Sequence, residues 1–388
     1  MPTTKDYHWR IAGFYFFYYA FVGTFAPYWS LYLQSIHFDP IEIAILMSVQ
    51  PVMRMVAPNI WGWLADHTGE RRRVVQIAAT LSAVFYLGVF ATTNFWGMFL
   101  VLLLMGFFWS ASMPLVEATT LTYLGKHAAR YGRIRSWGSV GFIMAVIGLG
   151  YAFDYIAIAW LLWAGLVCEL GILFFSRQIP PTEVLAHHTD SQSIRNILLQ
   201  PRVLALLGAC FLMSVAHGPY YTFFSIYLVE HDYAKSAVGW LWALGVICEI
   251  GVFFLMPWLV NRFGYTRILF ASFACAVLRF LLIGWGVDFL SLLLIAQMLH
   301  AVTFGAYHAA SLGLVHEFFQ GRHQSKGQAL FGSFTYGAGN MVGGLASGPI
   351  WEHFGASVLY SFSAGMALLG LLLVWKKLAG KDMGSTRQ

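Results

Sequence analysis

Charged residues are scarce in this chain. Asp, Glu, Lys and Arg make up only 10% of its 388 residues, whereas 59% are hydrophobic and the mean hydropathy is +0.66. Soluble domains carry about 25% charged residues, so this composition excludes an ordinary water-facing surface. The scarcity of charge indicates that most of the surface faces lipid.

Cysteine is also rare, and the motifs of catalysis are missing. The four cysteines lie in separate apolar runs without metal-ligand spacing, so we expect packing residues and no metal site or cofactor. The sequence has no HExxH motif, no nucleophile elbow and no acidic cluster within its apolar segments. No catalytic residue is therefore expected, and an enzyme is excluded.

Long apolar runs dominate what is present. Each has about 20 residues or more, enough to cross about 30 Å of hydrocarbon as a helix. They predict an all-α membrane protein with twelve transmembrane helices, at about 9–34, 41–65, 74–93, 95–124, 131–152, 155–176, 202–229, 236–260, 267–286, 289–318, 326–350 and 355–376. The opening stretch has no small-residue cleavage site, so the first helix is expected to be retained.

One long polar connection separates the sixth run from the seventh. It reads SRQIPPTEVLAHHTDSQSIRNILLQP and carries prolines, serines and charges. The predicted organisation has an N-terminal six-helix bundle, a cytoplasmic linker, a C-terminal six-helix bundle and a cytoplasmic tail, at 1–176, 177–201, 202–377 and 378–388.

Lysine and arginine are distributed unequally between the two predicted sides of the membrane. With both termini inside, the cytoplasmic segments hold 19 of them, and the opposite side holds only Lys235. The remaining three, Arg54, Arg135 and Arg279, fall inside predicted helices. Because cytoplasmic loops are enriched in positive charge, this split predicts cytoplasmic termini.

An internal repeat spans half the chain. The loop GWLADHTGERRR is matched 195 positions later by PWLVNRFGYTR, which aligns Leu64, Asp66, Gly69 and Arg72 with Leu259, Asn261, Gly264 and Arg267. Two parallel halves with a substrate site at the membrane midplane would explain the repeat.

The first of these loops also carries a family resemblance. Its pattern, G-x-L-x-D-x-x-G-x-[RK]-[RK], resembles the signature loop of the major facilitator superfamily, and the resemblance extends over the whole chain. Segments Phe14–Leu33, Pro114–Ala118 and Tyr131–Phe142 are similar to the lactose permease group. Segments Ala237–Glu249 and Gln297–Ala310, with YGRIRSWGSV, resemble the bacterial 3-phenylpropionate transporter branch.

The resemblance implies the major facilitator fold and alternating access in a bacterial inner membrane. It also implies proton-coupled import of a small aromatic carboxylate by a monomer. The expected partners are the small-molecule substrate, a proton and membrane lipid, with no nucleic acid. The rival hypothesis is a proton-coupled symporter of a sugar or oligosaccharide.

Ionisable residues in the first half are candidates for substrate binding. Glu117 and Arg135 stand where the lactose permease group carries its substrate-binding acid and arginine, and Arg54 is a possible anchor for an anion. The alternatives are a structural ion pair for the first two, and snorkelling for Arg54. Aromatic side chains that could line the site, or simply pack, include Trp137, Tyr28 and Tyr221.

The second half carries the candidates for proton coupling. Arg279 and His300 match the arginine and histidine of the permease proton machinery, and His217 occupies roughly the place of an acid. Gln297 and Thr303 depart from the pattern, since the permease has a lysine and an acid there. Glu249 is therefore the predicted protonatable carboxylate, with a satisfied core acid as the alternative reading.

The signature loop predicts a conformational latch. Asp66 is expected to cap a helix end or to pair with a cytoplasmic arginine, and Arg72 belongs to the same predicted latch. Gly62 and Gly69 are expected to allow a close approach and a tight turn.

Overall fold

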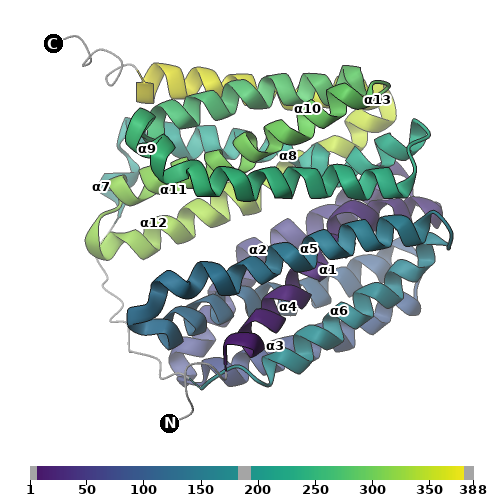
Figure 1. Cartoon of the computed structure of the whole chain (residues 1–388), viewed down its shortest axis with the longest axis horizontal. Coiled ribbons are helices and arrows are strands. Elements are labelled where there is room, and N and C mark those ends of the chain that lie inside the picture. The colour runs from purple at the N-terminus through teal and green to yellow at the C-terminus, as the bar shows by residue number, and fades with distance from the viewer. Residues whose placement is uncertain (1–6, 182–193, 380–388) are drawn as a thin grey trace. The chain divides into compact units, whose positions relative to one another are not determined.

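The computed structural model describes residues 7–181 and 194–379, and both stretches are built of helices joined by short connections (Figure 1). The chain divides into two compact units. Unit 1 holds described residues 7–181 together with 234–240, and unit 2 holds 194–233 and 241–379. Most of the predicted linker, 182–193, and of the predicted tail, 380–388, lies outside the described residues.

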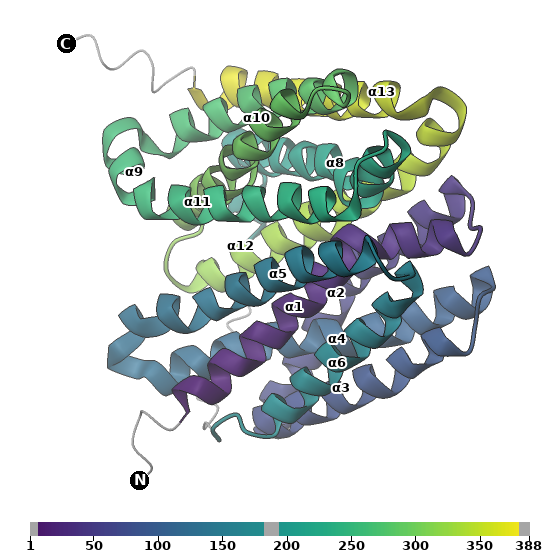
Figure 2. The ribbon, with the colours of Figure 1, turned by 45° about the vertical axis from the view of Figure 1, so that its right-hand side comes forward.

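Unit 1 contains six long helices. They are α1 (His8–Ser35), α2 (Pro40–Thr68), α3 (Arg71–Tyr86) with a 3-10 turn at Leu87–Phe90, α4 (Phe95–Leu124), α5 (Tyr131–Phe153) and α6 (Leu161–Ser176). Helix α1 lies against α5 and α6, as Figure 2 shows, and α4 packs on α2 and α3. This packing brings α1, α4 and α5 together around the polar residues of this half.

Local sequence explains where α2 begins and ends. Asp39 accepts a hydrogen bond from the Glu42 backbone at 2.8 Å while the Glu42 side chain accepts one from the Asp39 backbone, and Pro40 occupies the first turn. At the other end Gly69 takes a left-handed conformation with φ 70°, which ends the helix. The predicted tight turn at Gly69 is confirmed.

Unit 2 is a second series of helices. They are α7 (Arg195–Leu198), α8 (Pro201–Glu230), α9 (Lys235–Gly286), α10 (Leu290–His300), the π-helical η4 (Ala301–Ala306), α11 (Tyr307–Phe318), α12 (Gln324–Phe331), the π-helical η6 (Gly332–Gly339), α13 (Asn340–Val374) and the π-helical η7 (Trp375–Ala379). The first residues of α9 group with unit 1. Helices α9 and α13 are interrupted at Gly264 (φ 73°) and Gly355 (φ 79°), which fall between or beside the predicted spans.

Nine helical segments of the described chain are long and apolar enough to cross a membrane. Two of them, Lys235–Gly286 and Lys326–Leu378, include the glycine breaks and are each counted once. Helix α1 is outside this set although its 28 residues span about 42 Å at about 1.5 Å per residue. Its many tyrosines lower its mean hydropathy.

The internal repeat is visible in the backbone. His37 (φ 68°) and Asp232 (φ 62°) are 195 positions apart, as are Gly69 and Gly264. Gly125 (φ 47°) and Gly321 (φ 57°) are separated by 196 positions. Left-handed backbone is uncommon, particularly outside glycine, so its recurrence at this interval indicates that both halves share the same turn geometry.

Glycines let α8 approach α13 closely in unit 2. A Cβ on Gly218 would lie 2.5 Å from the backbone nitrogen of Gly344 and 2.7 Å from the Cα of Gly343, so only glycine fits there. This contact fixes the part of α8 that carries His217 and Tyr220.

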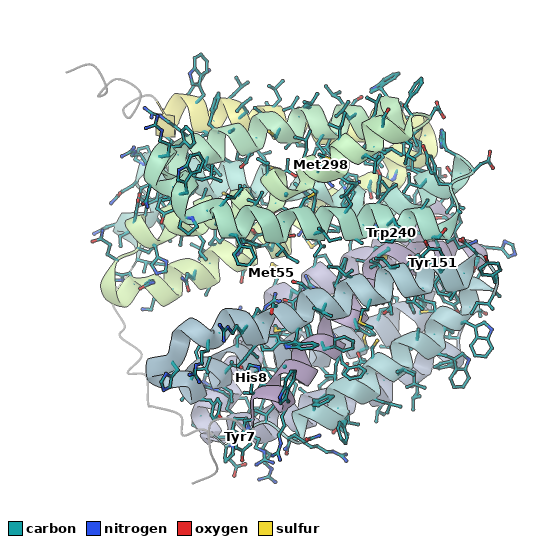
Figure 3. The ribbon with its side chains drawn as sticks, viewed as in Figure 1. Tyr7, His8, Met55, Tyr151, Trp240 and Met298 are labelled. Atoms are coloured by element: carbon teal, nitrogen blue, oxygen red, sulfur yellow. The ribbon has the colours of Figure 1, made fainter. Side chains whose placement is uncertain are left out.

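Large apolar side chains project from the outer faces of both units. Met298 is 51% exposed and Phe254 is 81% exposed, and Figure 3 shows Met298 among other outward-pointing side chains. Together with the helix lengths, this surface identifies a multi-pass membrane protein.

Candidate functional site

Unit 1 brings Glu117 and Arg135 together, as predicted. Arg135 Nε on α5 lies 3.9 Å from Glu117 Oε1 on α4, with the side chains 30% and 40% exposed. Tyr131 donates a hydrogen bond to the same carboxylate at 2.8 Å. Arg135 donates to the hydroxyl of Tyr19 on α1, and its guanidinium lies over the Tyr19 ring, 4.0 Å from the centroid. We call these four residues the unit 1 cluster.

Charge compensation defines the chemistry of the unit 1 cluster. One carboxylate faces one guanidinium, so the cluster is neutral overall and remains partly accessible. Such a pair can exchange its contacts for ligand hydroxyls, or its acid for a ligand carboxylate. Tyr131 was not predicted here, although it stands one helical turn before Arg135 in the recognised motif.

Arg54 lies apart from that pair. Its guanidinium is 5.3 Å from the Trp109 ring centroid, a cation–π contact, and its side chain is exposed. Within the described ranges no ion pair joins Arg54 to Glu117. Its role as an anion anchor stays a prediction.

Two predicted aromatic contacts, Trp137 and Tyr28, also make contacts with other residues of unit 1. Trp137 follows Arg135 by two residues, which places it on a different face of α5, and its ring lies against Trp9 at 5.4 Å. Tyr28 is buried and donates to the Val146 carbonyl at 2.5 Å.

Unit 2 holds a second polar cluster around Arg279. This guanidinium on α9 is 0% exposed. Its Nη1 lies 3.2 Å from His217 Nε2 and donates to Thr303 Oγ1 at 3.4 Å, and its Nε donates to the Ala296 carbonyl at 3.1 Å. The Tyr220 ring covers one face, 4.3 Å from the guanidinium carbon.

The contacts of His217 define its protonation state. Its Nδ1 lies 2.8 Å from the Met213 carbonyl, which can only accept, so Nδ1 carries the hydrogen. Nε2 faces Arg279, which can only donate, so Nε2 offers a lone pair. His217 is therefore neutral in this arrangement.

His300 completes the predicted grouping. Its ring lies 6.4 Å from that of His217 and stacks on Tyr220 at 5.8 Å, while Tyr220 donates to Gln297 Oε1 at 3.0 Å. The unit 2 cluster consists of Arg279 with His217, Tyr220, Gln297, His300 and Thr303. Sequence reasoning named Arg279, His217 and His300 as one machinery, and the structure places them side by side.

A small recess adjoins the unit 2 cluster. Its empty space, including the mouth, is about 220 Å³, and it is lined by Met213, Ser214, His217, Tyr221, Thr303, Phe304, Tyr307, Tyr336 and Asn340. Two π-helical segments, η4 and η6, contribute part of the wall. Such widened turns often occur at functional sites. The predicted substrate contact Tyr221 lines this recess.

Glu249 on α9 packs against η4. A Cβ on Gly305 would come within 2.9 Å of Glu249 Cγ, so this carboxylate side chain packs directly over the glycine. Among residues 7–181 and 194–379 no ion pair links Glu249 to Arg279.

Sequence reasoning missed Glu169 on α6. The residue is 0% exposed, and in the described chain neither carboxylate oxygen has a hydrogen-bond partner; Ser82 on α3 is nearby. A single acid in the apolar run AGLVCELGILFF was the available signal, but no family motif marks it.

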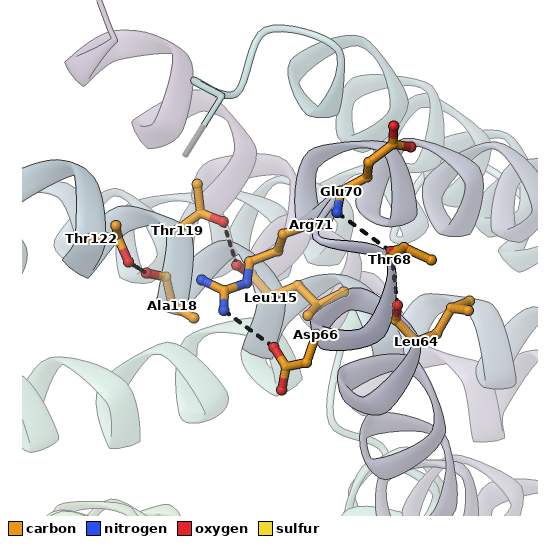
Figure 4. Close-up of polar contacts among 9 residues, drawn as sticks. All are labelled: Leu64, Asp66, Thr68, Glu70, Arg71, Leu115, Ala118, Thr119 and Thr122. Atoms are coloured by element: carbon orange, nitrogen blue, oxygen red, sulfur yellow. Dashed lines mark hydrogen bonds and ion pairs between the residues drawn. The ribbon is translucent and has the colours of Figure 1, made fainter. Parts of the chain in front are cut away.

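The latch residue Asp66 pairs with an arginine of the same loop, which agrees with the expected pairing. Asp66 pairs with Arg71 at 3.5 Å (Figure 4), whereas Arg72 Nη2 donates to the Arg177 carbonyl at 2.8 Å. Arg71 begins α3 and reaches back to the end of α2, while Arg72 points toward the end of α6. At Gly62 an added Cβ would meet no described atom within 4 Å, so no close approach occurs there.

An all-helical chain with polar clusters inside apolar helices has the construction of a membrane transport protein. The sequence profile of the MFS_1-like family matches residues 8–362, and the chain belongs to that family. The predicted membership of the major facilitator superfamily is confirmed.

Individual relatives agree with this assignment. The chain is 27% identical over 369 residues to the probable 3-phenylpropionic acid transporter of Escherichia coli (strain K12), covering 94% of this chain and 95% of the relative. It is 26% identical over 365 residues to the maltose permease of Geobacillus stearothermophilus, covering 93% and 92%. A crystal structure of a mutant of the nucleoside transporter NupG superposes with a TM-score of 0.87 at 17% identity, covering 96% and 100%. The relatives are transporters, and this chain is a transporter and not an enzyme.

Proposed function

We propose that this protein is a secondary active transporter that imports a small aromatic carboxylate together with protons, by alternating access. The observation that carries the proposal is the concentration of ionisable side chains into one cluster in each unit, on helices that are otherwise apolar. Such side chains are costly in lipid and persist where they bind a substrate or an ion. The similarity to the 3-phenylpropionic acid transporter supports the substrate class.

The proposed topology has twelve crossings in two six-helix bundles. The nine candidate segments, α1, and the breaks at Gly264 and Gly355 support that count. Bundles at 1–176 and 202–377, with a linker at 177–201, would place both termini in the cytoplasm of a bacterial cell, following the distribution of Lys and Arg.

Each cluster has a proposed role. Glu117 and Arg135 contact polar groups of the substrate, with Arg54, Trp137, Tyr28 and Tyr221 as further predicted contacts. Proton coupling is assigned to Glu249, His300, Arg279 and His217. The loop with Gly62, Asp66, Gly69 and Arg72 acts as the conformational latch.

A sugar symporter is the second candidate. The neutral Glu117–Arg135 pair with its two tyrosine hydroxyls suits a hydroxylated ligand, and the maltose permease is nearly as similar as the phenylpropionic acid transporter. Substrate charge distinguishes the two hypotheses.

Uptake into proteoliposomes tests the proposal. The full chain is reconstituted, and labelled 3-phenylpropionate, maltose and uridine are supplied under an imposed pH gradient, with and without a protonophore. A weak acid also crosses lipid without a transporter, so protein-free liposomes are measured in parallel. The quantity compared is the initial uptake rate in excess of that background, and only the part of it that an excess of unlabelled compound abolishes is counted as transport. We expect saturable, protonophore-sensitive uptake of 3-phenylpropionate; saturable uptake of maltose alone would establish the rival function.

A further inference from the structure

Arg279 has no counterion among the residues that the structure describes. Its neighbours within hydrogen-bond distance are His217, Thr303 and the Ala296 carbonyl, all of them neutral. No carboxylate in the described part of the chain forms an ion pair with it, and it is 0% exposed. Removing one partner of a buried ion pair is strongly destabilising, so a buried guanidinium without an acid needs an anion from elsewhere.

Three hydrogen-bonding nitrogens around this charge also lack partners. Arg279 Nη2, Gln297 Nε2 and His300 Nδ1 are buried and have no partner among the described residues. The Gln297 oxygen already accepts from Tyr220, so its free atom is the amide nitrogen, a donor. Buried polar groups in folded proteins are almost always paired, so two unpartnered donors, Arg279 Nη2 and Gln297 Nε2, indicate a binding site for an acceptor.

The recess lies next to the residues that contact Arg279. His217 and Thr303 form part of its wall, and Arg279 lies directly behind them at 3.2 and 3.4 Å. Tyr221 and Phe304 add aromatic surface.

We infer that Arg279 binds the carboxylate of the transported substrate, with Gln297 Nε2 as an additional donor and with His300 Nδ1 as another in the tautomer that carries a hydrogen there. This inference rests on the proposed function and deepens it, because it places the anion site in unit 2 instead of at Arg54 or Arg135. It also gives Arg279 and His300, which are proposed above for proton coupling, a direct contact with the substrate. The contrast with Arg135 is decisive: that guanidinium already has Glu117, whereas Arg279 has no acid in the described chain. The ligand supplies the missing charge, and its ring lies against the aromatic wall.

An internal acid tests this assignment. Thr303→Asp places a carboxylate where Thr303 Oγ1 now faces Arg279, and Thr303→Asn is its neutral match. Affinity for 3-phenylpropionate is measured on the purified full chain by calorimetry. We expect the Asp variant to bind at least about 30-fold more weakly than the Asn variant, because its carboxylate competes with that of the ligand. Equal affinities of the two variants would overturn the inference.

A second variant guards against misfolding. Gln297→Glu keeps the side-chain shape and adds an acid next to Tyr220, so it too is expected to weaken binding of 3-phenylpropionate, while melting curves report on folding. Titration with sodium chloride alone distinguishes an inorganic anion from a carboxylate. If chloride binding is lost in the acidic variants while 3-phenylpropionate affinity is kept, the site holds an inorganic ion and the inference fails.

Failure of the inference is distinguishable from failure of the proposed function. Protein-dependent uptake of 3-phenylpropionate that Thr303→Asp leaves unchanged relative to Thr303→Asn rejects the site at Arg279 but keeps the transporter of aromatic acids. Absence of any saturable uptake of 3-phenylpropionate by the wild-type chain, with uptake of maltose, rejects both.

Discussion

The two polar clusters handle charge in opposite ways. In unit 1 the guanidinium of Arg135 faces the Glu117 carboxylate, and both side chains remain partly exposed. In unit 2 the guanidinium of Arg279 is buried among neutral groups. A compensated pair suits ligands rich in hydroxyls, whereas an uncompensated cation selects an anion. In the proposed function, the unit 1 cluster would orient the substrate through its polar groups, and the unit 2 cluster would bind its negative charge.

The repeat sharpens this contrast. Both halves share left-handed turns 195 positions apart, yet Arg54 and Glu249, which are separated by the same interval, carry opposite charges. Backbone geometry is therefore common to the halves, while side-chain chemistry is particular to each.

The largest expected effect is on the uptake rate, when the substitution of Arg279 is compared with that of Arg135. Arg279→Gln should lower the initial uptake rate of 3-phenylpropionate by at least about 100-fold, since it removes the charge at the centre of its cluster, which corresponds to about 2.7 kcal/mol. Arg135→Gln should lower it by about 10-fold, since that site keeps Tyr19 and Tyr131. Proteoliposome uptake at matched protein density measures both. The opposite order would reverse the roles of the clusters.

The next largest expected effect is a loss of stability when the close packing of α8 on α13 is disturbed. Gly343→Ala would force a Cβ against the Val215 backbone on α8 and is expected to destabilise the protein by about 1–3 kcal/mol. Gly365→Ala on the same helix is the matched control, because no described atom lies within 4 Å of its added Cβ. Thermal melting in detergent compares the two variants. Equal melting temperatures would argue against the close α8–α13 contact.

A double-mutant cycle on Glu117 and Arg135 should give a coupling free energy smaller than the effects above. Because Glu117 and Arg135 are partly exposed and 3.9 Å apart, their coupling free energy is expected to stay below about 1 kcal/mol. The single variants Glu117→Gln and Arg135→Gln and the double variant are compared by unfolding free energy. A coupling of several kcal/mol would mean that the pair is structural and not exchangeable.

The smallest effect is expected at Glu169. A buried carboxyl without a partner is too costly to hold as an anion, so the neutral isostere Glu169→Gln should change stability by less than about 1 kcal/mol. Melting at pH 7 checks this, with Glu169→Lys as the disruptive comparison. Strong destabilisation by Gln would indicate that Glu169 is charged and paired in the membrane.

Much of the fold was predictable because apolar runs and glycine breaks are local signals. The break at Gly264 lies between two predicted spans and Gly355 lies at the start of another, while the Glu117–Arg135 pair followed from a motif. The direction in which each side chain leaves its helix was not predictable: Trp137 lies against Trp9, and Arg71, not a neighbouring arginine, contacts Asp66. Glu169 was not predicted because no motif marks it and only its charge within an apolar run distinguishes it. The π-helical turns were not predicted because no sequence pattern identifies them.

One stacked arrangement restricts how any ring can sit in the recess. Phe304 lies between the imidazoles of His300 and His308, with centroids 5.4 and 6.4 Å away and planes within 10° and 11° of parallel. The orientation of this phenyl ring is therefore shared with a nearly parallel imidazole one helical turn away in each direction. A planar guest in the recess would meet a wall ring whose tilt is already held by these neighbours, and the offset-stacked or edge-to-face arrangement it adopts would be set by them.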